Sequence, residues 1–196
     1  MKEKIRRLVE ETEFIYYICI ILVALVLIIP IFNKTLDVYF DDGIQHIARA
    51  FGTLQSIKEQ GLFPNIISSF TNEFGYSWNL FYGPLSTYGL ILMKFISGNF
   101  ITAYKVFCFL CLALSGIFMY KFLISITKNS NTSLLVSVIY LTFPYHLTDW
   151  YIRNALGEFM SFMFVPLVFL GLYNLFNTQE NYYYLTFGAV RFNINA

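Results

Sequence analysis

The chain has little charge for its length. Only 13% of its 196 residues are Asp, Glu, Lys or Arg, whereas globular domains carry about one quarter. Long apolar runs take the place of the charge, and 57% of the residues are hydrophobic. A soluble domain of this size does not bury so much apolar surface, so the composition predicts an all-α polytopic membrane protein. Lys and Arg form no block that would follow a phosphate backbone, which excludes nucleic acid as a partner.

Cysteine is also scarce. Cys19, Cys108 and Cys111 all lie inside apolar runs, where we expect them to pack as small apolar side chains. Cys108 and Cys111 have C-x-x-C spacing, but no second ligand pair accompanies them. The sequence also has no phosphate-binding loop, no G-x-S-x-G or H-E-x-x-H motif and no internal repeat. These absences remove the common motif-bearing enzyme classes.

The first apolar run, residues 14–32, is about 19 residues long. That length spans a bilayer and is too long for the apolar region of a signal peptide. No small-residue cleavage site follows, so the run predicts an uncleaved transmembrane helix. The basic sequence MKEKIRR before it predicts a cytoplasmic N-terminus in the cell membrane. Residues 33–79, the longest polar stretch, are then expected to form an outer loop.

Within that loop, residues 42–60 have the periodicity of an amphipathic helix. Its apolar side holds Ile44, Ile47, Phe51 and Leu54, and its polar stripe holds Asp42, His46, Arg49, Thr53 and Ser56. We expect this juxtamembrane helix to lie flat on the bilayer with its apolar side down. The polar stripe would then face a cleft above the membrane.

Residues 80–190 are expected to supply the remaining membrane helices, for a total of about four to six. Residues 101–127 and 159–176 are expected to span, residues 133–147 are marginal in length, and 182–190 has the composition of a further helix start. Residues 80–96 are open to two interpretations. If they cross, residues 149–158 face the cytoplasm; if they form a half-buried juxtamembrane segment, residues 149–158 return to the outer face beside His46.

The first candidate site consists of Asp41, Asp42, His46 and Arg49. A carboxylate at a membrane surface can act as a general base or bind a divalent cation such as Mg²⁺ or Mn²⁺. A cation or an arginine can neutralise a phosphate leaving group. The structural alternative is that the two aspartates cap the helix and that His46 and Arg49 belong to a solvated face.

The second candidate site is the sequence LTDWYIRNALGEF, with Asp149, Arg153, Asn154 and Glu158. Here too a structural alternative exists. Asp149 and Arg153 are four residues apart and can form a simple ion pair. Glu158 begins an apolar helix, where a carboxylate complements the helix dipole.

Four pieces of the chain, in order, carry a family resemblance. They are the single N-terminal helix, DDGIQHIAR, EFGYSWNLFYGPLSTY and YIRNALGEFMSFMFVPLVFLGL. This order resembles the N-terminal part of membrane glycosyltransferases of the GT-C type. In particular it is similar to the bacterial membrane proteins described as 6-pyruvoyl-tetrahydropterin synthase-related, and more distantly to the YfhO-like proteins. No zinc-binding pterin site accompanies the resemblance.

The resemblance implies transfer of a sugar from a polyprenyl-phosphate carrier to a cell-envelope acceptor at the outer face. Asp42, with its neighbour Asp41, matches the acidic residue of the first outer loop, which is a base or a metal ligand. Glu158 or Asp149 matches the acidic residue of the next outer loop, which favours residues 80–96 not crossing. The substrate-binding candidates are His46, Arg49, Arg153 and Glu158.

On this interpretation residues 1–196 are one membrane domain, the N-terminal part of a larger module that contacts membrane lipid. Members of such families have more membrane helices than this chain, so we expect an incomplete carrier cleft and an inactive polypeptide when it is alone. The alternative function is that of a non-catalytic integral membrane protein, a scaffold or accessory in envelope assembly.

Overall fold

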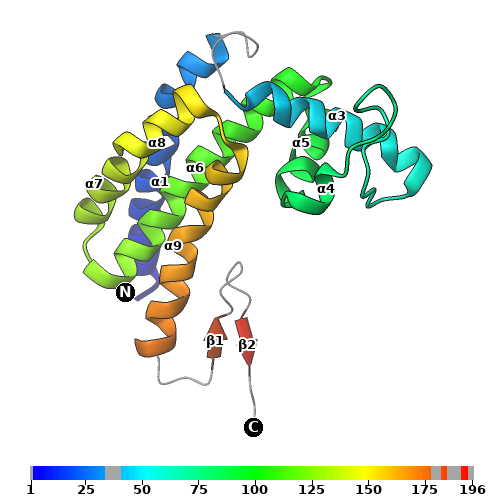
Figure 1. Ribbon diagram of the computed structural model, residues 1–196. Coiled ribbons are helices and arrows are strands. Elements are labelled where there is room, and N and C mark those ends of the chain that lie inside the picture. The colour runs from blue at the N-terminus through cyan, green and yellow to red at the C-terminus, as the bar shows by residue number, and fades with distance from the viewer. Residues whose placement is uncertain (1, 34–40, 178–181, 185–190, 194–196) are drawn as a thin grey trace. The chain divides into compact units, whose positions relative to one another are not determined.

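A computed structural model describes residues 2–33, 41–177, 182–184 and 191–193, and the side chains of residues 13–32 and 41–177 (Figure 1). In chain order the helices are α1 (Lys2–Asn33), α3 (Gly43–Gln60), α4 (Trp78–Phe81), α5 (Pro84–Ser97), α6 (Phe100–Thr127), α7 (Ser130–Leu141), α8 (Pro144–Thr148), the wide turn η1 (Asp149–Arg153) and α9 (Leu156–Asn177). The predicted all-α membrane class is confirmed.

One predicted helix start is replaced by extended backbone. Strand β1 (Tyr182–Tyr184) pairs antiparallel with β2 (Arg191–Asn193), with Tyr183 opposite Phe192. Three consecutive tyrosines favour a strand over a helix, because aromatic side chains lose rotamer freedom against a preceding helical turn. Residues 185–190 of that predicted helix lie outside the described residues.

Three described helices are long and apolar enough to cross a membrane: residues Glu13–Phe32 of α1, and the whole of α6 and α9. They correspond to predicted segments 14–32, 101–127 and 159–176. α7 has 12 residues and α5 has 14. At 1.5 Å per residue α5 is about 21 Å long, which is shorter than a hydrocarbon core of about 30 Å.

The chain divides into two compact units. The first contains Met1–Ile29, Cys111–Leu147 and Ser161–Ala196, and the second contains Pro30–Leu110 and Thr148–Met160. α1, α6 and α9 contribute residues to both.

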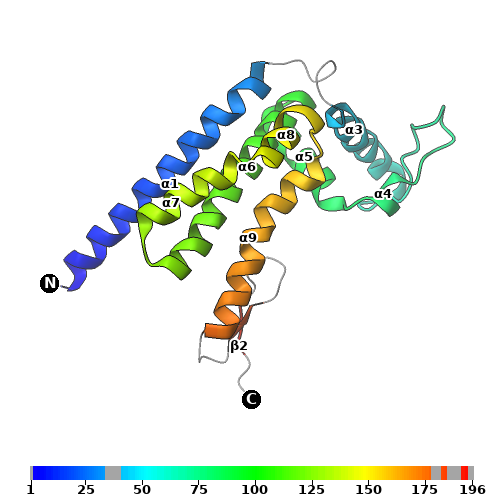
Figure 2. The same ribbon diagram turned by 60° about the vertical axis from the view of Figure 1, so that its left-hand side comes forward.

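Close helix packing holds the first unit together, where α6 and α7 run side by side (Figures 1 and 2). A Cβ atom at Gly116 of α6 would lie 2.7 Å from Ile20 of α1 and 2.9 Å from Leu141 of α7. Ile20 and Leu141 are fully buried. A glycine at this position therefore lets three helices approach closely, as small residues do in membrane bundles.

In the second unit α3 lies beside α5 (Figures 1 and 2). α3 coincides with the predicted amphipathic helix except that Asp42 precedes its first residue. Its polar stripe, however, is the buried side: His46, Arg49, Thr53 and Ser56 are 6%, 1%, 0% and 1% exposed. Ile44 and Phe51 are about half exposed on the opposite side, as suits a helix whose apolar side faces lipid.

The buried stripe fastens the segment between α3 and α5. Ser56 Oγ accepts a hydrogen bond from the Ser68 backbone N–H at 3.0 Å. Asn79 donates to Thr53 Oγ1 at 3.1 Å and to the Pro64 carbonyl at 2.9 Å. These neutral hydrogen bonds fix the segment against α3.

The end of α1 and the start of α6 are in contact. Lys105, in the second turn of α6, donates to the Phe32 carbonyl at the end of α1 over 2.8 Å. Both helices are long and apolar enough to span, and this contact puts the last residues of α1 and the first residues of α6 on the same side of the membrane when they do. The geometry therefore favours the interpretation in which residues 80–96 make no net crossing.

Candidate functional site

The first turn of α9 is completed by side chains from elsewhere in the second unit. The Leu156 N–H donates to Nε2 of His46 at 3.2 Å, and the Gly157 N–H is hydrogen-bonded to the Tyr82 hydroxyl. Such N–H groups have no acceptor within their own helix. The His46 and Tyr82 rings also contact each other, with centroids 5.6 Å apart. α3 and the segment before α5 thereby cap α9.

His46 can accept this bond because it is neutral. Burial, and secondly the positive charge of Arg49, lowers the pKa of His46 from 6.5 to about 4. At physiological pH the imidazole therefore carries one proton, and acceptance at Nε2 assigns that proton to Nδ1. This position and charge make His46 a positioning residue between α3 and α9.

Arg49 is almost completely enclosed. Its Nη2 donates to the Gly83 carbonyl at 2.8 Å and its Nε to Asn79 Oδ1 at 3.4 Å, and its Cζ lies 4.2 Å from the centre of the Tyr82 ring. Burial lowers the pKa of Arg49 to about 10, opposed by Tyr82, so the guanidinium stays charged at neutral pH. Its bonds lock the residues that lead into α5.

The wide turn η1 arises from an i to i+5 hydrogen bond, from the Asn154 N–H to the Asp149 carbonyl at 2.8 Å. Asn154 ends it in the left-handed region at φ 53°, a conformation that asparagine tolerates better than most residues. Its Oδ1 accepts from the Tyr104 hydroxyl at 2.7 Å and its Nδ2 donates to the Trp150 carbonyl at 2.8 Å. Wide turns of this kind are frequent at functional sites.

Asp149, the first residue of η1, is a fully buried carboxyl group. Its Oδ1 accepts from the Ala155 N–H at 3.4 Å and lies 3.9 Å from Arg153 Nη1, whereas its Oδ2 has no hydrogen-bond partner among the described residues. Burial, followed by the charge of Glu158, raises the pKa of Asp149 to about 7, although Ala155 and Arg153 oppose the shift. This carboxyl group therefore changes charge near neutral pH.

Backbone hydrogen bonds join the two candidate segments. The Asp41 N–H donates to the Ile152 carbonyl at 3.1 Å, and the Asp42 N–H donates to the Arg153 carbonyl at 3.0 Å. Both aspartate side chains are exposed, and the Asp42 carboxylate makes no capping hydrogen bond to α3. Helix capping by the Asp42 side chain, the structural alternative, is therefore absent.

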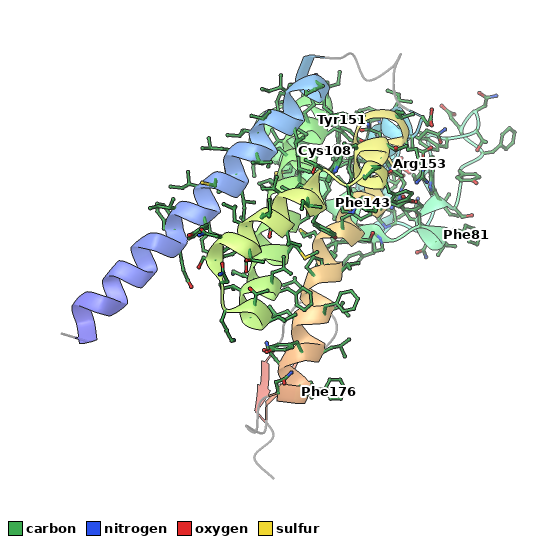
Figure 3. The ribbon with its side chains drawn as sticks, turned by 90° about the vertical axis from the view of Figure 1, so that its left-hand side faces the viewer. Phe81, Cys108, Phe143, Tyr151, Arg153 and Phe176 are labelled. Atoms are coloured by element: carbon green, nitrogen blue, oxygen red, sulfur yellow. The ribbon has the colours of Figure 1, made fainter. Side chains whose placement is uncertain are left out.

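Arg153 and Glu158 form a bidentate ion pair at the same surface. Nη1 and Nη2 of Arg153 lie 2.7 and 2.9 Å from the two carboxylate oxygens of Glu158, and the side chains are 38% and 37% exposed. Arg153 projects from η1 (Figure 3). The rim formed by Asp41, Asp42, Arg153 and Glu158 is the accessible part of the candidate site, and we call it the acidic rim.

The structure thus brings the two predicted sites together but divides their members by accessibility. The acidic rim is open to a ligand. His46 and Arg49 are buried and engaged in internal contacts, so their side chains do not project with Asp42 into a common cleft.

Sequence reasoning missed Asn79 and Tyr104, and it noted Tyr82 only as an interfacial aromatic residue and not as a cap of α9. Each is a neutral side chain whose role depends on a partner far away in the chain. The only signal was the density of polar and turn residues in EFGYSWNLFYGPLSTY.

Among the residues that the structure describes, no three His, Cys, Asp or Glu side chains lie close enough together to hold a metal ion. Asp42 remains a candidate ligand for a divalent cation that is also held by groups outside these residues or by a substrate phosphate.

The spanning helices and the polar surface at their ends define an integral membrane protein. The model of the 6-pyruvoyl-tetrahydropterin synthase related domain, a membrane protein family, matches residues 80–190. That is more than half of the chain, so the protein belongs to this family. An uncharacterized protein of Lactococcus lactis subsp. cremoris (strain MG1363) is 30% identical over 176 residues. The match covers 87% of this chain but only 28% of the relative. No solved structure matches the chain.

Proposed function

We propose that the protein contributes the acceptor-activating part of a GT-C-like glycosyltransferase, which moves a sugar from a polyprenyl-phosphate carrier to a cell-envelope acceptor at the outer membrane face. The observation that carries the proposal is the pair of backbone hydrogen bonds from Asp41 and Asp42 to η1. They hold exposed carboxylates beside Arg153 and Glu158 at the ends of spanning helices. The resemblance of DDGIQHIAR to the first outer loop of such enzymes supports it.

In the proposed reaction the acceptor hydroxyl oxygen attacks the anomeric carbon of the carrier-linked sugar. Asp42 takes the hydroxyl proton, and Asp41 keeps the local field negative. The bond from the anomeric carbon to the phosphate oxygen breaks, and the carrier leaves with the electron pair as polyprenyl phosphate. Arg153, positioned by Glu158, supplies positive charge for that phosphate. A divalent cation at Asp42 would serve the same end.

The test is sugar transfer in membranes that carry the full-length gene product, with polyprenyl-phosphate-linked [¹⁴C]hexoses as donors. The Asp41→Asn, Asp42→Asn double variant should lose about 10²- to 10⁴-fold of the transfer rate, the range for removal of a general base. Glu59→Gln is the matched control, because it changes an exposed carboxylate at the other end of α3 to a carboxamide. Undiminished transfer by the double variant would remove the assignment.

A non-catalytic role in envelope assembly is favoured by a different observation, since His46 and Arg49 are buried and form hydrogen bonds within the protein. It predicts that wild-type membranes show no transfer and that the double variant restores growth or envelope integrity to a deletion strain as well as the wild type does.

A further inference from the structure

A polar and aromatic hollow opens on the second unit. It has a volume of about 330 Å³ and is lined by Gln45, Phe70, Thr71, Tyr76 and Trp78. This volume is at the lower end of the range for small-molecule sites. The Tyr76 ring stands at 88° to Trp78 and the Phe70 ring at 61°, each with centroids 5.9 Å apart. Three rings at steep angles make a corner with apolar walls, which we call the aromatic corner.

The aromatic corner is preorganised by backbone hydrogen bonds. Ile67 and Tyr76 exchange N–H···O bonds of 2.9 and 3.1 Å, and the Gly75 N–H donates to the Phe70 carbonyl at 3.0 Å. Gly75 has φ +81°, and a Cβ there would lie 2.7 Å from the Ile66 side chain, so the turn needs glycine. Rigid walls reduce the entropy cost of binding a ligand.

The turn of residues 67–76, whose ends pair through Ile67 and Tyr76, is packed against α3. Ile67 is fully buried and lies so close to Gly52 of α3 that a Cβ at position 52 would overlap its side chain. Gln60 donates to the Ile66 carbonyl at 2.8 Å. The aromatic corner therefore has a fixed position relative to α3, the helix that carries Gln45 and follows Asp42.

Polar groups complete the lining. Gln45 is exposed and offers an amide N–H₂ and a carbonyl side by side. The Thr71 hydroxyl donates its proton to the Gly75 carbonyl at 2.8 Å, which leaves its oxygen as an acceptor. Apolar ring faces next to a donor and two acceptors match a pyranose, which has an apolar C–H face and an equatorial edge of hydroxyl groups.

Position links this hollow to the acidic rim. Asp42 and Gln45 are three residues apart on the same stretch of chain, and residues with that spacing on a helix are neighbours on its surface. We propose that the aromatic corner binds a pyranose ring of a saccharide acceptor, so that a hydroxyl of that saccharide reaches Asp42. The role as an acceptor subsite rests on the proposed transfer function, whereas the binding of a sugar does not.

A lipid acyl chain is the rival occupant, because Trp and Tyr are common where a protein meets the membrane interface. An acyl chain cannot form hydrogen bonds with the Gln45 amide or the Thr71 oxygen at the rim of the hollow. Covering these groups with lipid would leave them unpaired. The lining therefore favours a saccharide.

The experiment measures tryptophan fluorescence of the whole protein in phospholipid nanodiscs, without maltoside detergents whose headgroups carry the same rings. The probes are methyl β-glucoside, methyl β-galactoside and methyl α-mannoside, and sorbitol is the open-chain control. Trp78 is one of two tryptophans, and the other, Trp150, is 1% exposed. A saturable change with at least one glycoside and none with sorbitol is expected.

Three variants decide the location. Tyr76→Ala keeps the reporter but removes one wall, and should weaken binding about threefold to tenfold, in line with the value of one aromatic contact. Tyr76→Phe keeps the ring and should bind within about twofold of the wild type. Phe81→Ala removes a ring that is 83% exposed and absent from the lining (Figure 3), and should leave binding unchanged.

The absence of a saturable response to every glycoside would overturn the proposal, and so would equal binding by Tyr76→Ala and the wild type. Quenching of Trp78 by phosphatidylcholine brominated near the headgroup, undisturbed by glycosides, would assign the corner to lipid and also overturn it. Glycoside binding without any sugar transfer would contradict the proposed enzymatic function and support the saccharide site. Sugar transfer without glycoside binding would support the enzymatic function and contradict the saccharide site.

Discussion

The two histidines of the chain are equally buried, at 6% exposed each, but their surroundings differ. His46, in the second unit, accepts a hydrogen bond from the backbone of α9. His146, in the first unit, lies among aromatic rings, stacked on Phe162 with centroids 3.9 Å apart and edge-on to Tyr140 at 4.5 Å. The surroundings of His146 are therefore mainly aromatic packing, whereas His46 is also held by a hydrogen bond to a helix that is distant in the chain. Equal burial therefore does not mean equal sensitivity to substitution.

The largest effect is expected at Asp149, where the second unit holds a carboxyl group out of water. Because the folded-state pKa of about 7 lies above the ordinary 3.8, the folded protein binds this proton more tightly than the unfolded chain does. The contribution of this group is most favourable below pH 4, declines as the pH rises from about 4 to 7 and is constant above that. The total loss is about 4 kcal/mol.

Asp149→Asn mimics the protonated group and keeps an acceptor for the Ala155 N–H. Thermal melts between pH 4.5 and 8 should show a falling midpoint for the wild type and a flatter profile for the variant, which should be the more stable protein at pH 8. Parallel profiles would show that Asp149 titrates normally. His46 has the opposite effect, because its lowered pKa makes the folded protein lose stability as the pH falls from about 6.5 to 4. The wild type and Asp149→Asn are therefore best compared with His46→Gln present in both.

Arg49→Met tests the hydrogen-bonded character of the second unit directly. The change leaves the Gly83 carbonyl without its donor and removes the contact with the Tyr82 ring. We expect a loss of about 2–3 kcal/mol, measured as the thermal midpoint by fluorescence-detected size exclusion. Arg49→Lys should recover part of it. A methionine variant as stable as the wild type would mean that desolvation of the guanidinium cancels its bonds.

Gly116→Ala tests the packed character of the first unit. The added methyl group would overlap two fully buried side chains, Ile20 and Leu141, so we expect a loss of about 1–2 kcal/mol despite the better helix propensity of alanine. Gly83→Ala is the control, because a Cβ there has nothing within 4 Å. Equal midpoints for the two variants would show that the helices of the first unit can move apart freely.

The smallest effect concerns the histidines themselves. His46→Phe deprives the Leu156 N–H of its acceptor and should cost about 1 kcal/mol, whereas His46→Gln should keep most of the stability. His146→Phe loses a hydrogen bond to the Tyr140 backbone but keeps its stacking on Phe162, and should cost less than His46→Phe. Midpoints in one detergent are sufficient to compare them. If the two phenylalanine variants lose the same stability, the distinction between the units is wrong.

Local patterns predicted much of the fold. The apolar runs marked α1, α6 and α9, and the periodicity of residues 42–60 marked α3, because hydrophobic spacing is a property of one segment. The orientation of the polar stripe was not predictable in the same way. His46 and Arg49 have the same spacing whether they meet solvent, a ligand or the protein, and only their partners at Leu156 and Gly83 decide which.

The candidate site was predicted in part for the same reason. The sequence identified the four residues of the acidic rim because charged residues are few in this chain. In the structure they lie together at one surface. Asn79, Tyr82 and the corner formed by Tyr76 and Trp78 are neutral, and their importance comes from hydrogen bonds and ring angles that no linear spacing encodes.

The wide turn η1 makes the chain length between α8 and α9 critical. An i to i+5 turn holds one residue more than an ordinary helical turn, and Asn154 closes it. Deletion of a single residue there would let the backbone continue as a regular α-helix and rotate α9 by about 100° about its own axis. Leu156 would then turn its N–H away from His46, and Glu158 would leave Arg153. A length change too small to disturb any apolar run would thus separate the first turn of α9 from His46 and divide the acidic rim.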